Sequence, residues 1–417
     1  MTFQPPSKSL TARDYQFIAL VVIVFLIISA ALVYANLTLT GGGDFYVHWV
    51  GSRSFLFEKI DPYSGEVPAR VQELVYGDSA KAGNKPYILV TPFHILLLYF
   101  PFSLLSDPQL ARAIFTLILE LALFALAWSS LRLTDWEVPR YFLVLFFLFC
   151  IFNFYAFQAI LEASPVLLLG LVYAGILLAL RSEQDEFAGA LMAVSLYYWE
   201  VGAPFLILVA WRVYSEGRGR VLAGFGMLSF ILLAASFLWY PNWIIPYLRA
   251  GMNNLKTDFG FTTQAAFAHI FPSQNGIFAW IFIGVLVIAL GYEWSTAHGA
   301  DFRRFYWACC LSLVASPLLG FRTELEHLAV LVIPLALIFA IVNDRWQRFG
   351  NGLATLFLLA VFSIPWAVYF LAPPRLDGMA RELLFLFLPL FTIIGLYWIR
   401  WWAIRRPRVW SDTLSRK

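Results

Sequence analysis

Long apolar runs recur along almost the whole chain, and they limit it to one class of fold. The hydrocarbon core of a bilayer is about 30 Å thick, which about 20 residues of helix can cross. A chain inside that core must satisfy its backbone hydrogen bonds internally, which favours helices. The sequence therefore predicts an all-α polytopic membrane protein with apolar runs at residues 17–35, 110–131, 141–157, 166–180, 221–239, 277–291, 305–319, 328–342, 353–370 and 383–399.

The composition supports this class and excludes others. Of the 417 residues, 61% are hydrophobic and 13% are charged, whereas soluble domains carry about 25% charged residues. A net charge of +3 gives no indication of a nucleic-acid partner. The cysteines Cys150, Cys309 and Cys310 fall inside apolar runs and form no disulfide or zinc pattern. Because the histidines and acids also lack metal-ligand spacing, we expect no metal and no cofactor.

We expect one transmembrane domain, residues 1–417, built as a bundle of about 11–13 membrane-spanning helices. Residues 36–109 form a first external loop with juxtamembrane helices, and residues 240–276 form a second long external loop. The segment 86–106 is apolar but is interrupted by Pro92 and Pro101. Two topologies remain open, because a full span at 86–106 reverses the middle loops unless 187–211 also changes between a span and a hairpin.

Arginines in the short loops predict the orientation, since basic residues concentrate on the cytoplasmic side. We favour the topology in which 187–211 is a hairpin, because all the loop arginines then lie on one side. Both termini are then cytoplasmic, whereas Asp44, Gln158 and Arg322 face outward. The arginines that define the cytoplasmic side are Arg132, Arg140, Arg181, Arg212, Arg218, Arg220, Arg303, Arg304, Arg345, Arg348, Arg400, Arg405, Arg406 and Arg408.

The polar segment 41–64, directly after the first apolar run, holds the main candidate site. Its glycines end the preceding helix, and Asp44 then begins an amphipathic segment that we predict to be a helix on the membrane surface. The four-residue spacing places His48 on the same face as Asp44. The carboxylate of Asp44 has two interpretations, an N-terminal helix cap or a catalytic base, and the two are compatible.

Two acids inside apolar segments, Glu120 and Glu200, give a separate signal. Charged groups at such depth usually face an internal cavity or pair with a partner. The sequence leaves open whether these two line a pocket or serve only the packing.

The first loop resembles a known family of membrane enzymes. The segment DFYVHW from Asp44, the later Arg53 and the segment DPYS from Asp61 are similar to GT-C glycosyltransferases that use polyprenyl-phosphate sugars, nearest to glycosyltransferase family 87. Looser similarities are Phe157-Gln158 before a span and Ala315-Ser316-Pro317 at the end of a late span. One departure is Trp199-Glu200, where the family often has a Lys-Pro pair.

The resemblance implies a GT-C-type bundle that transfers a sugar, with a mannose-like hexose expected, from a polyprenyl phosphate to a hydroxyl of a glycan or glycolipid. Transfer would invert the sugar and occur on the extracytoplasmic side of the cell membrane. The family's acidic catalytic base maps onto Asp44, and Arg53 and Arg322 are candidates for the phosphate. The remaining candidate substrate residues are His48, Trp49, Asp61, Tyr63, Gln158, Glu162, Glu326 and His327.

The main alternative is a transporter or flippase of a lipid-linked sugar. Such a protein would also have many spans, buried acids and aromatic grooves. It would be expected to show paired halves with broken helices at matching positions, and the sequence shows no such symmetry.

Overall fold

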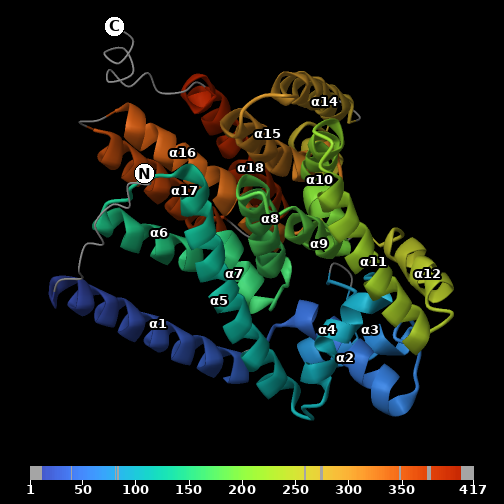
Figure 1. Ribbon diagram of the computed structural model, residues 1–417. Coiled ribbons are helices and arrows are strands. Elements are labelled where there is room, and N and C mark those ends of the chain that lie inside the picture. The colour runs from blue at the N-terminus through green and yellow to red at the C-terminus, as the bar shows by residue number, and fades with distance from the viewer. Residues whose placement is uncertain are drawn as a thin grey trace, which may run out of the picture.

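The computed structural model is a helical bundle (Figure 1). It describes residues 12–38, 40–79, 81, 84–257, 260–272, 276–346, 349–372 and 377–404. Within these residues the one extended pairing is an isolated antiparallel bridge between Phe261 and Thr323. The all-α class predicted from the sequence is therefore confirmed for the described part of the chain.

The helices follow the predicted apolar runs closely. The first half of the chain contains α1 (Ala12–Thr38), α2 (Gly43–Arg53), η1 (Ser54–Glu58), α3 (Glu66–Tyr76), α4 (Phe93–Ser103), α5 (Pro108–Thr134), α6 (Arg140–Phe152), α7 (Phe154–Leu161) and α8 (Val166–Arg181). The second half contains α9 (Asp185–Ser195), η2 (Leu196–Tyr198), α10 (Trp199–Ser215), α11 (Gly219–Trp239), α12 (Ile244–Asn254), α13 (Thr263–Ile270), α14 (Ile277–Ala297), α15 (Phe302–Ala315), η4 (Ser316–Leu319), η5 (Leu325–Leu331), α16 (Val332–Arg345), α17 (Gly350–Leu371) and α18 (Asp377–Ala403). Each predicted run lies within one helix or two consecutive ones.

The number of spans is lower than the sequence led us to expect. Seven helical stretches of the described chain are long and apolar enough to cross a membrane, or nine if each of two sharply bent helix pairs is one span. One of the seven, Asp185–Ser215, joins α9, η2 and α10, which fold back as a hairpin. Several predicted spans are short or bent. α8 has 16 residues, which gives a length of about 24 Å, and α6 and α7 are bent by 49° where they meet.

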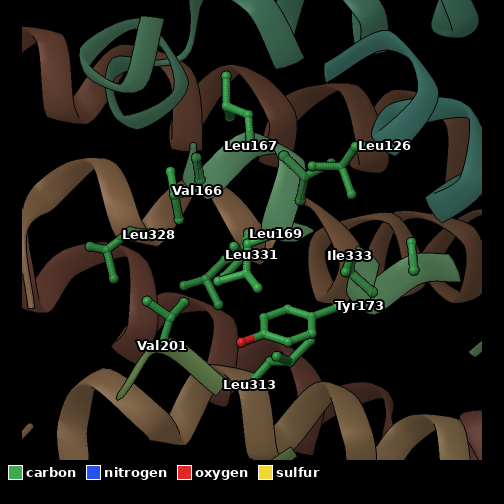
Figure 2. Close-up of a cluster of buried hydrophobic side chains, with 14 of the residues drawn as sticks. Leu126, Val166, Leu167, Leu169, Tyr173, Val201, Leu313, Leu328, Leu331 and Ile333 are labelled. Carbon is green, nitrogen blue, oxygen red and sulfur yellow. The ribbon is translucent and has the colours of Figure 1, made fainter. Parts of the chain in front are cut away.

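The central core packs α5, α8, α10, α15, η5 and α16 against one another. Figure 2 shows Tyr173 of α8 surrounded by aliphatic side chains, among them Leu313 and Leu331. A side chain at Gly202 of α10 would place its Cβ 2.3 Å from the Tyr173 hydroxyl oxygen, so the crossing of α8 and α10 requires glycine. Because Val166 of this core lies two residues after Ser164 and Leu328 directly follows His327, the core fixes the segments that carry the candidate site.

The segment 187–211 is a hairpin, as predicted. α9 descends from Asp185 to the short turn η2, and α10 returns, so that Asp185 and Arg212 line the same cavity. Arg218, at the start of α11, bonds to Asp185 and also to the Leu180 carbonyl at 3.2 Å. Both ends of the hairpin therefore meet at one end of the bundle, while its turn reaches toward α2.

Two glycines let α9 and α11 pack at backbone contact. An added Cβ would lie 1.9 Å from the Val221 carbonyl oxygen at Gly189, and 2.1 Å from the Glu186 carbonyl oxygen at Gly224. Small residues at such crossings allow membrane helices to approach closely. This contact holds the hairpin in place.

Several of the loop arginines that predicted the cytoplasmic side line two cavities at one end of the bundle, opposite the candidate site. A cavity of about 550 Å³ is lined by Arg181, Arg212, Arg218 and Arg220. A neighbouring cavity of about 750 Å³ is lined by residues at the ends of α5, α8, α16 and α18 and at the start of α15. We call this the arginine end. Arg348, Arg405, Arg406 and Arg408 lie outside the described residues.

The predicted surface helix is instead buried. α2 begins at Gly43, and its residues from Gly43 to Ser52 are all buried. It packs between α3, α4 and α5, so the aromatic side chains expected along lipid headgroups fill protein interior instead. α4, which covers α2, has 11 residues and is too short to span a bilayer. The segment 86–106 therefore belongs to the first loop, in agreement with the favoured topology.

Candidate functional site

The site lies where four segments meet: the start of α2, the loop at residues 84–91, the turn after α7, and residues 324–327. Gly42 has a φ of +80°, which suits glycine, and its N–H donates to the Leu161 carbonyl at 2.9 Å. The fully buried Arg112 of α5 donates to the Gly41 carbonyl at 2.9 Å and to Asn36 of α1 at 2.6 Å. These bonds fix the first turn of α2 against the bundle.

Asp44 is not the helix cap that the sequence allowed. The capping residue is Gly42, which makes no side-chain capping bond. The Asp44 carboxylate instead accepts from the Lys85 ammonium, with Nζ 2.6 Å from Oδ1. The same ammonium pairs with Glu324 and lies 3.5 Å from Glu326. We call Asp44, Lys85, Glu324 and Glu326 the carboxylate–lysine cluster.

The pKa values of Asp44 and Glu324 shift in opposite directions within the cluster. Burial acts to raise the pKa of Asp44, but attraction and hydrogen bonding by Lys85 hold that pKa below its usual value. Burial raises the pKa of Glu324 to about 8, against the attraction of Lys85. The lowered pKa of Asp44 favours its ionised carboxylate, whereas the raised pKa of Glu324 favours its protonated form. Neighbouring groups whose pKa values are pushed apart are characteristic of acid–base sites.

Glu162 and Tyr87 border the cluster. The Glu162 carboxylate accepts from the Gly43 N–H at 3.2 Å and from the Tyr87 hydroxyl at 3.4 Å. Burial raises the pKa of Glu162. The Tyr87 ring lies directly on Gly43, where an added Cβ would be 2.1 Å from a ring carbon. Gly43 is therefore needed for the loop to cover the start of α2.

His48, one helical turn after Asp44, is a neutral imidazole that hydrogen-bonds to both α2 and the hairpin turn. Its Nδ1 lies 2.7 Å from the Asp44 carbonyl oxygen, which can only accept, so Nδ1 carries the proton. Nε2 then accepts from the Tyr197 hydroxyl at 2.9 Å and from Thr91 at 3.2 Å. Burial lowers the pKa of His48 to about 4. The imidazole thus joins α2 to the turn of the hairpin without adding charge.

Several predicted substrate residues hold the first loop together instead of lining the cluster. Trp49 donates to the Phe102 carbonyl at 3.0 Å, and Arg53 donates to the Ser103 carbonyl at 2.8 Å. Tyr63 donates its hydroxyl to the Thr91 carbonyl at 2.9 Å. Asp61 accepts from the Tyr63 N–H at 2.9 Å, which forms the predicted turn.

The remaining predicted residues divide between the cluster and its surroundings. Arg322 donates to the carbonyls of Asn254 and Thr257 at 2.9 and 2.6 Å, and so anchors the second long loop. His327 accepts from the Glu324 N–H at 3.4 Å and lies beside Tyr198. Gln158 is half-buried on α7. The cluster thus brings together Asp44 and Glu326, with His48, Glu162 and His327 in contact with it.

The deeper acids take part in interhelix contacts. Glu120 is fully buried on α5 and accepts from the Ser29 hydroxyl of α1 at 2.7 Å. The backbone carbonyl of Glu200 accepts from Ser316 at 2.9 Å, and its side chain is half-buried. Glu120 thus connects α5 to α1, and Glu200 connects α10 to η4.

Sequence reasoning did not single out Lys85 or Glu324. Lys85 stands before Pro86 in a loop with other polar residues, and nothing in its local pattern distinguishes it from Lys81. Glu324 lies in the segment FRTELEH, whose Glu326 and His327 were considered. The available signal was the pair of acids, Glu324 and Glu326, separated by one residue in a loop between two apolar runs.

The cluster also offers the spacing of a cation site. One oxygen each from Asp44, Glu324 and Glu326 lies within 4.8 Å of the others, and hard divalent cations prefer such oxygen ligands. Lys85 already contacts all three carboxylates and supplies positive charge there. That no metal is required stays a prediction.

Comparison of the chain with protein-family models, with curated proteins and with solved structures gave no match. The function is therefore inferred from the chemistry of the site. The site contains an ionised carboxylate, a buried ammonium, acids of raised pKa, and aromatic side chains around them. Such a site can accept a proton from a hydroxyl and can hold an anionic group.

Proposed function

We propose that this protein is a membrane glycosyltransferase that moves a sugar, a mannose-like hexose, from a polyprenyl-phosphate donor to a hydroxyl of a glycan or glycolipid. The observation that carries the proposal is the Asp44 carboxylate, which is held ionised by Lys85 at the start of a helix next to the membrane-spanning bundle. The resemblance of the first loop to glycosyltransferase family 87 supports the same reaction.

Asp44 serves as the general base. An acceptor hydroxyl becomes a strong nucleophile only when a positioned group takes its proton in the transition state. The C–O bond to the acceptor forms on one face of the sugar, while the bond to the phosphate oxygen breaks on the other. The proton passes to Asp44, the electron pair stays with the leaving phosphate, and the sugar is inverted.

Lys85 replaces the arginines as the candidate for the donor phosphate. Arg53 and Arg322 are both engaged with backbone carbonyls, whereas Lys85 lies at the base itself. Its ammonium is a compact charge on a flexible stem that can follow a phosphate. The departing phosphate gains negative charge, which a fixed cation stabilises.

One observation favours the alternative of a lipid-linked sugar transporter. Two helix pairs, α1 with α2 and α6 with α7, are sharply bent, and Gly42 in the first break bonds directly to Leu161 at the end of α7. Discontinuous helices whose ends meet at a substrate site are typical of transporters. A transporter needs no general base, so an assay of sugar transfer distinguishes the glycosyltransferase from the transporter.

The direct test is transfer by the purified protein. Supplied with radiolabelled polyprenyl-phosphate hexoses and a panel of glycan and glycolipid acceptors, the protein should produce a labelled product with an inverted anomeric centre. The product is measured by chromatography and NMR. Absence of transfer across the panel, together with donor uptake into vesicles, would establish the transporter instead.

We also propose that the arginine end is cytoplasmic and the site extracytoplasmic. In intact cells, cysteine at Ser79, exposed near the site, should react with an impermeant thiol reagent. Cysteines at Ser182 and Ser215, exposed before and after the hairpin, should both be protected. The native cysteines are buried and give little background. Labelling of Ser182→Cys but not of Ser215→Cys would contradict the hairpin.

A further inference from the structure

The loop at residues 84–91 closes the site over Asp44. One carboxylate oxygen, Oδ1, is held by Lys85. The other, Oδ2, is inaccessible to solvent and makes no hydrogen bond of normal geometry among the described residues, although the neighbouring Ser164 hydroxyl helps to lower the pKa of Asp44. Asp44 is 5% exposed. A base must come within hydrogen-bond distance of the proton it takes, and in this conformation an acceptor hydroxyl cannot reach either oxygen.

The closed loop contains a strained residue. Tyr87 has a φ of +53° although it carries a bulky side chain and is buried. Aromatic residues rarely adopt this conformation, and strain of this kind persists only where surrounding contacts enforce it. The contacts on Tyr87 and its neighbours are the ion pairs of Lys85, the Tyr87 hydroxyl bond to Glu162 and a bond from Gln72 to the Pro86 carbonyl at 2.9 Å. Thr91, bonded to His48, fixes the other end of the loop.

We propose that Lys85 and Tyr87 form a gate over Asp44, and that a lipid phosphate opens it by drawing the Lys85 ammonium away from the carboxylates. The proposal rests on the proposed function and adds the regulation of the same site. In the closed state Lys85 masks the base, and in the open state the same side chain holds the donor. The same movement of the Lys85 side chain then binds the donor phosphate and exposes the Asp44 carboxylate.

The surrounding charges favour this exchange over direct entry of an anion. The acids facing Lys85 come from α2, from the turn after α7 and from residues 324–326, namely Asp44, Glu162, Glu324 and Glu326. A phosphate that approaches the cluster is repelled by the ionised Asp44 carboxylate and is attracted by the Lys85 ammonium. Proton transfer also requires the acceptor hydroxyl to lie within hydrogen-bond distance of the Asp44 carboxylate, whose Oδ1 is bonded to Lys85. Withdrawal of the ammonium frees this oxygen for the acceptor.

Cysteine at Ser164 reports the gate without any sugar transfer. Ser164 lies beside Asp44 and is fully buried, and the exchange of a hydroxyl for a thiol changes the side chain little. The rate of modification by a small water-soluble methanethiosulfonate is measured with no ligand, with a short-chain prenyl phosphate, with the matching prenol, and with inorganic phosphate.

Prenyl phosphate should raise the modification rate of Ser164→Cys about tenfold or more, in proportion to the open population. Prenol should not change the rate. A rise with inorganic phosphate as well would support a gate that responds to phosphate chemistry in general, and a rise with prenyl phosphate alone would assign the lipid as the source. No rise with either phosphate, or an equal rise with prenol, would overturn the proposal.

Variants of the gate give a second test in the same Ser164→Cys background. Lys85→Gln should raise the ligand-free modification rate several-fold and abolish the response to prenyl phosphate. Lys81→Gln, an exposed lysine of the same loop, should behave as the parent. If Lys85→Gln fails to fold, Tyr87→Phe tests the same point, because it removes the bond to Glu162 but keeps the ring on Gly43. Unchanged rates in the folded variants would contradict the gate.

The gate and the proposed function can fail separately. If prenyl phosphate opens the site but no donor yields a transfer product, the gate stands and the glycosyltransferase does not. If transfer is observed and Ser164→Cys is insensitive to ligand, the enzyme stands and the gate is wrong.

Discussion

Asp44→Asn should bind the lipid donor and remain folded, yet lose sugar transfer by roughly 100-fold to 10,000-fold, the range typical for a removed general base. The amide keeps the shape of the side chain and an oxygen that can accept from Lys85. Lys85 also keeps its partners Glu324 and Glu326. What the amide lacks is the basic oxygen that takes the proton from the acceptor.

Initial rates at saturating donor, with donor affinity determined separately, measure this effect. Asp78→Asn is the matched control, because Asp78 is an exposed acid in the same loop that bonds only to the neighbouring Ser79 N–H among the contacts seen here, at 2.7 Å. It should transfer sugar at the wild-type rate. If Asp44→Asn does so too, Asp44 is not the base, and the contact between the α1–α2 break and the end of the bent pair α6–α7 would favour transport.

Gly189→Ala should prevent stable folding, with a loss of about 3 kcal/mol or more, at the upper end of what overpacking costs. The added methyl group would lie 1.9 Å from the Val221 carbonyl oxygen and 2.6 Å from the Phe225 nitrogen. Both are backbone atoms of α11, so no side chain can move aside and the helices themselves must separate. Expression yield, monodispersity in detergent and thermal unfolding report the effect.

Gly226→Ala provides the control for that substitution. It lies on α11 as well, but an added Cβ there meets no atom within 4 Å. Alanine is the better helix former by about 1 kcal/mol, so the variant should be as stable as the wild type or slightly more stable. A Gly189→Ala protein with wild-type thermal stability would show that α9 and α11 do not pack at backbone contact.

The helices were predictable because bilayer-crossing segments must be long and apolar, and the hairpin followed from the one-sided arginines. The burial of α2 was not predictable. Its sequence contains Gly43, Asp44, His48 and Gly51 among aromatic residues, which fits a surface helix as well as an enclosed one. Only the packing of α3, α4 and α5 around it decides between the two.

The candidate site was predictable where an acid lies at a helix start, and not where it depends on contacts between distant segments. Asp44 and Glu326 were found from local patterns. Lys85 reaches Glu324 across 239 positions of sequence, and no short motif records such a pairing. Arg53 and Arg322 were assigned to phosphate from charge alone, whereas the nearest acceptors for their guanidinium groups are carbonyls exposed by the ends of other segments.

The bond network of Arg112 has a mechanical consequence. Through Asn36 and Gly41 this side chain connects α1, most of whose side chains between residues 22 and 38 are exposed, to the first residues of the helix that carries Asp44. Helices that border lipid tilt when the thickness of the bilayer changes. A tilt of α1 would pull on the backbone immediately before the base, so the acyl-chain length of the surrounding membrane becomes one of the variables that set the position of Asp44.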